Sequence, residues 1–204
     1  GDAGLRQTLQ QLTSANIQGL GAGENVTEAA KPLIINWRGI RIGILARCEV
    51  QFGMATRRCG GVAAFDATVY RAIHNLKRET DFVIASIHAA AEMCPWPSPD
   101  RQDAWRALVD AGADVVHGHH AHVPQGWEAY EGGLIFYGLG NLCIDPAAWS
   151  GHAQALWSLV PELSWDSGQV TMRAATAVIE DSGQSLHISD ADPVEAQAHQ
   201  AYLA

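Results

Sequence analysis

The sequence predicts an α/β protein in which helices and strands pack as layers. Three observations support this prediction. Apolar, strand-like segments alternate with amphipathic helical segments up to residue 123, which is typical of layered α/β packing. The later part changes to strands joined by short turns, which favours antiparallel pairing. Hydrophobic residues make up 48% of the 204 residues, enough for one sizeable core, so we expect a single domain over residues 1–204.

The N-terminal segment is expected to begin with a helix and continue into a hairpin. Leu5, Leu9 and Leu12 recur at helical spacing and indicate a helix that ends near Asn16. One or two helical turns follow and end before Pro32, since the residue preceding a proline disfavours helix. Two hairpin strands and a long loop complete the segment, over residues 33–37, 40–46 and 47–65.

Two helix–strand pairs follow this loop. Asp66 is expected to cap the first helix, and the buried strand after it ends at His88. Asp100 is expected to cap the second helix, and the buried strand after that one leads into a cluster of histidines. The four elements are predicted over residues 66–79, 81–87, 100–112 and 113–116.

The last third of the chain shows a different pattern. Short strand-like segments are separated by turn sequences such as those at residues 131–133 and 181–183. We expect antiparallel strands followed by a terminal helix, over residues 126–130, 134–139, 155–160, 170–179, 186–188 and 193–203.

Composition and charge exclude several classes of protein. The formal net charge is -9, and the thirteen Lys and Arg residues are scattered without a basic stripe, so we expect no nucleic-acid partner. No apolar run reaches membrane-spanning length. The cysteines show no C-x-x-C spacing and indicate free thiols in a reducing, cytoplasmic compartment, with two disulfides as the alternative: Cys48, Cys59, Cys94 and Cys143.

A histidine cluster is the strongest chemical signal. Four of the nine histidines lie within residues 117–122, directly after an apolar strand. Imidazole is the commonest protein ligand for transition metals, so the cluster predicts a metal site. If the segment is extended, His120 and His122 point to one face and can bind the same ion. The alternative is a surface cluster of titrating histidines.

Two further segments carry groups of the same kind. His88 and Glu92 follow one buried strand as the histidine cluster follows another, and ligand sites in α/β sheets lie beyond the carboxyl ends of strands. The apolar segment 135–141 ends in Gly-Leu-Gly-Asn, where Asn141 can orient a ligand or a substrate oxygen. The alternatives are a hydrogen-bonded His88, a solvated Glu92 and an ordinary strand–turn.

These segments together resemble a known family. Residues 118–126 and 135–141 resemble the signature of CapA-type proteins of the poly-γ-glutamate capsule-synthesis family, which are similar to calcineurin-like metallophosphatases. His88 and Glu92 fit the two ends of the family's His-Trp-Gly-x-Glu element. The resemblance covers roughly residues 1–145.

The resemblance implies a four-layer α/β/β/α metallophosphatase-like sandwich with one or two divalent ions. It implies that His88, His120 and His122 are metal ligands, and that His119 is a proton donor or supports a ligand. The identity of the metal stays open among Mn, Zn, Fe, Mg and Ca.

The departures from the family pattern lead to a second expectation. Ala89 and Ala90 replace the family's Trp-Gly, and Gly138 stands where the family often has Ser. The family elements that supply aspartate and asparagine ligands are absent from this chain. We therefore expect a missing N-terminal segment or a second chain to complete the metal site, so that this chain is the C-terminal portion of the fold.

Three functions remain open at this stage. The first is a metal-dependent enzyme that acts on a peptide or polyglutamate-type substrate by hydrolysis or transfer. The second is a peptide epimerase that inverts a Cα centre of a ribosomal precursor peptide. The third is a non-catalytic subunit of a capsule polymer synthesis or export assembly. The candidate acids and bases are His117, His119, Glu92 and Cys94, and the candidate substrate-binding residues are Asn141 and Gln125.

Overall fold

The computed structural model describes residues 1–50, 53–149, 151–166, 169–181 and 186–190. The chain divides into two compact units, the first made of residues 1–88 and 107–116 and the second of residues 89–106 together with the chain from residue 117 on. Helices and strands alternate as the α/β prediction requires, and that class is confirmed. The single domain stays a prediction. Within the described residues, no helix combines the length and apolar character needed to cross a membrane.

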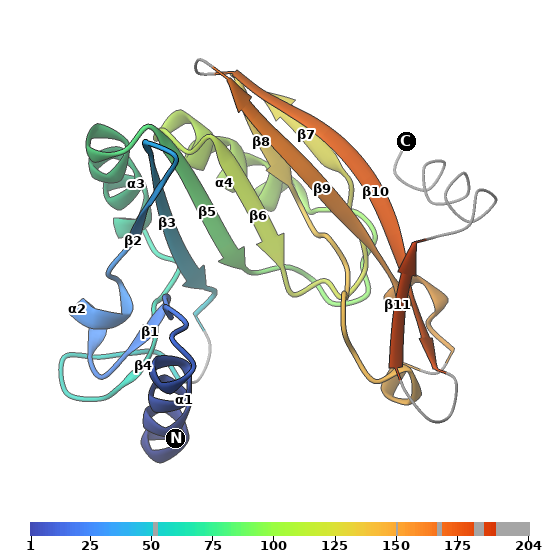
Figure 1. Ribbon diagram of the computed structural model, residues 1–204, viewed down its shortest axis with the longest axis horizontal. Coiled ribbons are helices and arrows are strands. Elements are labelled where there is room, and N and C mark those ends of the chain that lie inside the picture. Colours follow the sequence, from blue (N-terminus) through green and yellow to red (C-terminus); the bar gives the residue numbers. More distant parts are fainter. Residues whose placement is uncertain (51–52, 150, 167–168, 182–185, 191–204) are drawn as a thin grey trace. The chain divides into compact units, whose positions relative to one another are not determined.

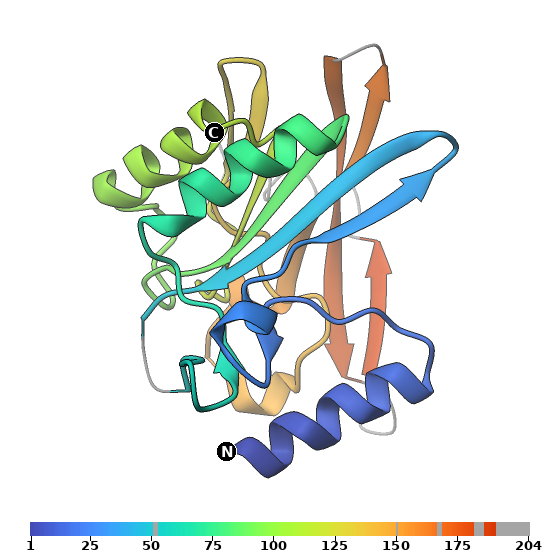
Figure 2. The same ribbon diagram turned by 90° about the vertical axis from the view of Figure 1, so that its left-hand side faces the viewer.

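Strands covered by a helix form the core of the first unit. The predicted hairpin is confirmed as β2 (Leu33–Trp37) antiparallel to β3 (Ile40–Cys48), and β3 runs parallel to β5 (Phe82–His88). Helix α3 (Thr68–Glu79) joins β3 to β5 in the chain and packs on both strands (Figure 2). Gly43 allows this close packing, because a Cβ there would lie 2.6 Å from Cγ of Leu76.

The N-terminal part of this unit consists of short elements. Helix α1 (Asp2–Ser14) is confirmed, and Asn25 caps α2 (Val26–Ala29) by accepting from the N–H groups of Thr27 and Glu28. The predicted continuous loop at 47–65 is wrong in part. Strand β3 extends to Cys48, and β4 (Gly61–Val62) pairs with β1 (Ala22–Gly23). A two-residue strand is too short to show a period in the sequence, which explains the miss.

Helix α4 (Pro99–Asp110) begins earlier than the sequence predicted. Asp100 lies in its first turn, so the prediction that Asp100 caps the helix is wrong. The N–H groups of Arg101 and Gln102 instead donate to the carbonyl oxygen of Ser98. Proline is favoured at the first helical position, because its fixed φ suits a helix and its missing N–H is not needed there.

Strand β6 (Val115–His119) follows α4 and comes after β5 in the strand order. Asp114, the residue before it, anchors its start. The Asp114 N–H donates to the Val83 carbonyl oxygen at 2.9 Å, and Asp114 Oδ2 accepts from the Val83 N–H at 2.7 Å. Lys77 Nζ donates to both carboxylate oxygens at 2.8 and 2.7 Å.

We expect Asp114→Ala to lower the free energy of unfolding by about 2 kcal/mol, since it removes charge-assisted hydrogen bonds and leaves the N–H of fully buried Val83 without its partner. Urea denaturation measures the change. The control is Asp110→Ala at the exposed end of α4, which should change stability by less than about 0.5 kcal/mol. Equal effects of the two substitutions would contradict this account of β6.

The second unit contains antiparallel strand pairs, as predicted for this part of the chain. Strand β8 (Gly133–Phe136) lies between β6 and β7 (Trp127–Tyr130), and Glu131 and Gly132 both have positive φ in the turn between β7 and β8. This is the type I′ hairpin expected for a two-residue connection.

A separate antiparallel sheet has the order β11–β10–β9 (Figure 1). Its strands are longer than predicted, because polar residues after position 160 hide the continuation of β9. The predicted helix at 193–203 and most of the predicted turn at 181–183 lie outside the described residues. The remaining elements are η1 (Pro146–Trp149), η2 (Ala153–Leu156), β9 (Trp157–Asp166), β10 (Gln169–Asp181) and β11 (Leu186–Asp190).

Candidate metal centre

The histidine segment leaves the strand conformation before its candidate ligands. Strand β6 ends at His119, and His120 and His122 have φ values of 92° and 61°. The condition for a shared face by strand geometry, an extended backbone at both residues, is therefore not met. Positive φ in a residue other than glycine is strained and persists only where its surroundings hold it, which is common at functional sites.

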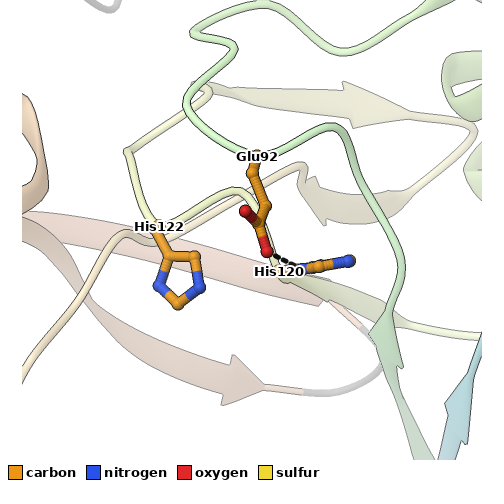
Figure 3. Close-up of side chains that lie close together, drawn as sticks. All are labelled: Glu92, His120 and His122. Atoms are coloured by element: carbon orange, nitrogen blue, oxygen red, sulfur yellow. Dashed lines mark ion pairs between the residues drawn. The ribbon is translucent and has the colours of Figure 1, made fainter.

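Three side chains of the second unit nevertheless converge. One possible ligand atom from each of Glu92, His120 and His122 lies within 4.8 Å of the others. Glu92 Oε1 is 3.7 Å from His120 Nδ1, with the Glu92 side chain 60% exposed and that of His120 15% exposed (Figure 3). Two imidazoles and a carboxylate offer the donor set that zinc, iron and manganese sites use, so the residues present fit a divalent transition-metal ion.

Asn141 fixes the orientation and tautomer of His122. Its Nδ2 donates to the carbonyl oxygens of His122 at 3.1 Å and Ala155 at 2.9 Å, so its Oδ1 is the atom that faces His122 Nδ1, at 2.9 Å. Because Oδ1 can only accept, Nδ1 of His122 carries the proton and Nε2 keeps the lone pair that a metal ligand needs. The predicted contact of Asn141 with a substrate stays a prediction.

We expect Asn141→Ala to weaken metal binding about 10- to 100-fold, because outer partners of ligand histidines contribute on this scale. The measurement is a competition titration with a chromophoric chelator. Asn75→Ala, at an exposed position of α3, is the control and should bind metal as the wild type does. If Asn141→Ala has wild-type affinity, Asn141 does not position His122 for a metal.

Packing between the loop after β5 and the histidine segment keeps Glu92 in place. The Met93 N–H donates to the Ala121 carbonyl oxygen at 2.9 Å. Ala90, Met93 and Trp149 pack against a buried cluster of Ala121, Val123 and Ala155. The Trp149 ring also lies 4.5 Å from the His122 ring. Neither Trp149 nor Ala155 was predicted to be near the site, because both contacts join segments far apart in the chain.

The two remaining histidines of the cluster form a close pair. The rings of His117 and His119 have centroids 3.8 Å apart. Burial, and secondarily the charge of His119, lowers the pKa of His117 to about 4. His117 is therefore neutral at physiological pH and weakly basic. The predicted acid–base roles of His117 and His119 stay predictions.

Cys94 and Gln125 meet in the same unit. Gln125 is 6% exposed, and its Nε2 donates to the Cys94 carbonyl oxygen at 2.7 Å. Cys94 Sγ lies 3.3 Å from the carbonyl oxygen of Trp96, to which it donates. The contact of Gln125 with a substrate and the acid–base role of Cys94 stay predictions.

His88 belongs to the other unit. It ends β5, where its carbonyl oxygen accepts from the Glu49 N–H at 3.0 Å. Its predicted role as a metal ligand stays a prediction. The expectation that a further segment or a second chain completes the site also stays a prediction.

The family of the chain follows from comparison with known proteins. Residues 1–146 match the model of the bacterial capsule synthesis protein family PGA_cap. The chain belongs to this family. The predicted resemblance to CapA-type proteins is thereby confirmed.

Several relatives of this capsule synthesis family are similar over most of the chain. Capsule biosynthesis protein CapA of Bacillus anthracis is 32% identical over 71% of the chain and 37% of its own length. PGA biosynthesis protein CapA of Bacillus subtilis is 32% identical over 71% of the chain and 39% of its own length. A probable polyglutamine synthesis accessory protein of Mycobacterium tuberculosis is 30% identical over 74% of the chain and 44% of its own length. The chain thus spans about two fifths of the length of these curated relatives.

The PGA_cap match contains the whole candidate centre. Glu92, His120, His122 and Asn141 all lie before residue 146, where the match ends. Trp149, which contacts the His122 ring, lies just beyond it. The three ligand candidates and the residue that orients His122 are therefore part of the segment that the capsule synthesis family shares.

Proposed function

We propose that this chain carries the metal site of an enzyme that acts on a polyglutamate-type chain during capsule polymer synthesis. The observation that carries the proposal is the convergence of Glu92, His120 and His122, with His122 held in a metal-binding tautomer by Asn141. The substrate class is supported by the relatives, whose names refer to capsule, PGA and polyglutamine synthesis. The proposed architecture is the four-layer metallophosphatase-like sandwich that the resemblance implies.

The residues of the centre have distinct tasks in this proposal. When bound, a divalent ion supplies Lewis-acid polarisation of a substrate oxygen. His122 would bind the ion through Nε2, because its Nδ1–H donates to Asn141 Oδ1. His120 and Glu92 would provide the other two metal ligands. Three protein ligands leave a position for a substrate group, as in catalytic sites. His119, adjacent to the ligand His120, is the proposed proton donor or acceptor.

Epimerisation of a peptide Cα is the second candidate reaction. The observation in its favour is Cys94, a thiol two residues from Glu92 on the loop that docks on the histidine segment. An inversion requires one group to remove the Cα proton and a second group, on the opposite face, to donate a solvent-derived proton to the resulting carbanion. His119 and Cys94 are the candidate pair for these two roles.

One experiment separates these reactions. The purified protein, loaded with Mn²⁺ or Zn²⁺, is incubated with γ-linked glutamate oligomers or α-linked peptides in deuterated water, and the products are analysed by mass spectrometry. Shorter products support hydrolysis, whereas deuterium at Cα without shortening supports epimerisation. Unchanged substrates with every metal tested would contradict an enzymatic role and favour a non-catalytic subunit of the synthesis assembly.

A further inference from the structure

The second unit contains a cavity to which no ligand has been assigned above. Its volume is about 510 Å³, within the range of small-molecule sites. The loop after β5 forms one wall, and the first turn of α4 forms another. The lining residues are Ala89, Ala90, Ala91, Cys94, Trp96, Pro97, Ser98, Pro99, Arg101, Trp105, Gln125 and Tyr137.

The charge of this cavity is opposite to that of the chain. The formal net charge of the protein is -9. Among the described residues that line the cavity, Arg101 is the single charged side chain, and no carboxylate lines it. The N-terminal end of α4, which contributes Pro99 and Arg101, adds the positive end of a helix dipole. The cavity is therefore suited to an anion rather than a cation.

Aromatic rings line the cavity, and one of them lies against the Arg101 guanidinium. The Arg101 guanidinium carbon lies 5.6 Å from the centroid of the Trp105 ring, and Trp105 is 1% exposed. This cation–π distance restricts the guanidinium, whose planar fork has the geometry that a carboxylate accepts. Trp96 is 65% exposed and offers apolar surface for the carbon chain of a ligand, whereas Tyr137, at 6% exposed, is part of the buried wall.

The cavity and the candidate metal centre share one loop. Ala89, Ala90 and Ala91 line the cavity and directly precede Glu92, and Cys94 lines it two residues later. This loop is tied to the histidine segment by the Met93–Ala121 hydrogen bond. A chain lying in the cavity is thus bound beside the residues proposed to act on it.

We infer that this cavity binds a carboxylate-bearing stretch of a γ-glutamyl chain, with Arg101 as the anchor for a carboxylate and the exposed Trp96 ring in contact with the methylene groups. The identity of the polymer rests on the proposed function. The recognition of a carboxylate rests on the cavity alone. Each residue of a γ-linked chain carries one free α-carboxylate and two methylene groups, which matches this combination of cation and aromatic ring.

Calorimetric titration of a short γ-linked glutamate oligomer into metal-free, chelator-treated protein tests the inference. We expect Arg101→Gln to weaken binding about tenfold or more, since a hydrogen-bonded charge pair contributes on the order of 1.5–3 kcal/mol and 1.4 kcal/mol is tenfold. Arg101→Lys should weaken it less, because the charge is kept while the fork is lost. The matched control is Arg71→Gln, at an exposed position of α3, which should bind as the wild type does.

A second probe separates charge from shape. The same oligomer with its carboxylates converted to amides should bind the wild type at least about tenfold more weakly than the acidic oligomer does. Arg101→Gln should bind the acidic and the amidated oligomer with equal affinity. Undetectable binding of the acidic oligomer to the wild type, or equal affinity of wild type and Arg101→Gln, would overturn the inference. Thermal denaturation shows whether each variant is folded, and if Arg101→Gln is not, Arg101→Lys and the amidated probe decide.

The titration is independent of the proposed enzyme. Because it is performed without metal, Arg101-dependent binding in a protein that shows no metal-dependent activity would leave the cavity assigned and remove the proposed function. Metal-dependent activity with no effect of Arg101→Gln on oligomer binding would retain the proposed function and remove the cavity assignment.

Discussion

His122→Ala is expected to remove the bound ion and to lower activity on a γ-glutamyl substrate by at least about a hundredfold. The expectation follows from the donor set: without His122, Glu92 and His120 leave only two donors, fewer than the three protein ligands of a catalytic site. Outer partners of ligand histidines alone account for up to about a hundredfold, so loss of a ligand should exceed that. Elemental analysis after dialysis measures the metal content, and a product assay measures activity.

A control substitution of another histidine and a measurement of stability make this test specific to the metal site. His74→Ala removes an imidazole from an exposed position of α3 and should keep wild-type metal content and activity. A metal that binds the folded state raises its stability by about 2.7 kcal/mol at a hundred times its dissociation constant. We therefore expect added metal to raise the denaturation midpoint of His74→Ala but not that of His122→Ala. Retention of a stoichiometric ion by His122→Ala would show that Glu92, His120 and His122 are not the site.

Local patterns predicted the elements that surround the centre. The apolar run before His117 correctly predicted the strand β6, and the helix predicted over residues 66–79 corresponds to α3. Ligand sites in α/β sheets lie beyond the carboxyl ends of strands, and this rule predicted that Glu92 lies near the histidine cluster. The structure places Glu92 with His120 and His122.

The conformation of the centre was not predictable in the same way. A spacing of two suggests a shared face only in a strand, and His120 and His122 have left-handed backbones instead. Hydrogen bonds between segments far apart in the chain hold them in place. Asn141 is hydrogen-bonded to His122, and Met93 is hydrogen-bonded to Ala121, which lies between the two histidines. Neither contact leaves a periodic signal in the sequence. The low pKa of His117 likewise depends on burial, which the sequence order of the cluster does not reveal.

Gly118→Ala is expected to have the largest effect on folding. An added Cβ would lie 2.1 Å from the carbonyl oxygen of Tyr137 and 2.8 Å from its carbonyl carbon, distances that real Cβ atoms essentially never show. The obstructing atoms are backbone, and the Tyr137 N–H donates to the Gly126 carbonyl oxygen at 3.2 Å, so they cannot move away without breaking the contact. The added Cβ would also lie 3.0 Å from Trp105 Nε1, in a side chain that is 1% exposed.

We expect Gly118→Ala to lower the free energy of unfolding by about 3 kcal/mol or to prevent folding, as severe overpacking does. For a chain of this size, that corresponds to a fall in Tm of roughly 6–12 °C. Gly4→Ala is the matched control, since a Cβ there meets nothing within 4 Å and lies in α1, where alanine stabilises by about 0.5–1 kcal/mol relative to glycine. Opposite signs for these two identical changes, measured by thermal denaturation, are the expected outcome. Wild-type stability of Gly118→Ala would mean that β6 does not approach Tyr137 closely, and that the histidine segment after β6 is placed differently.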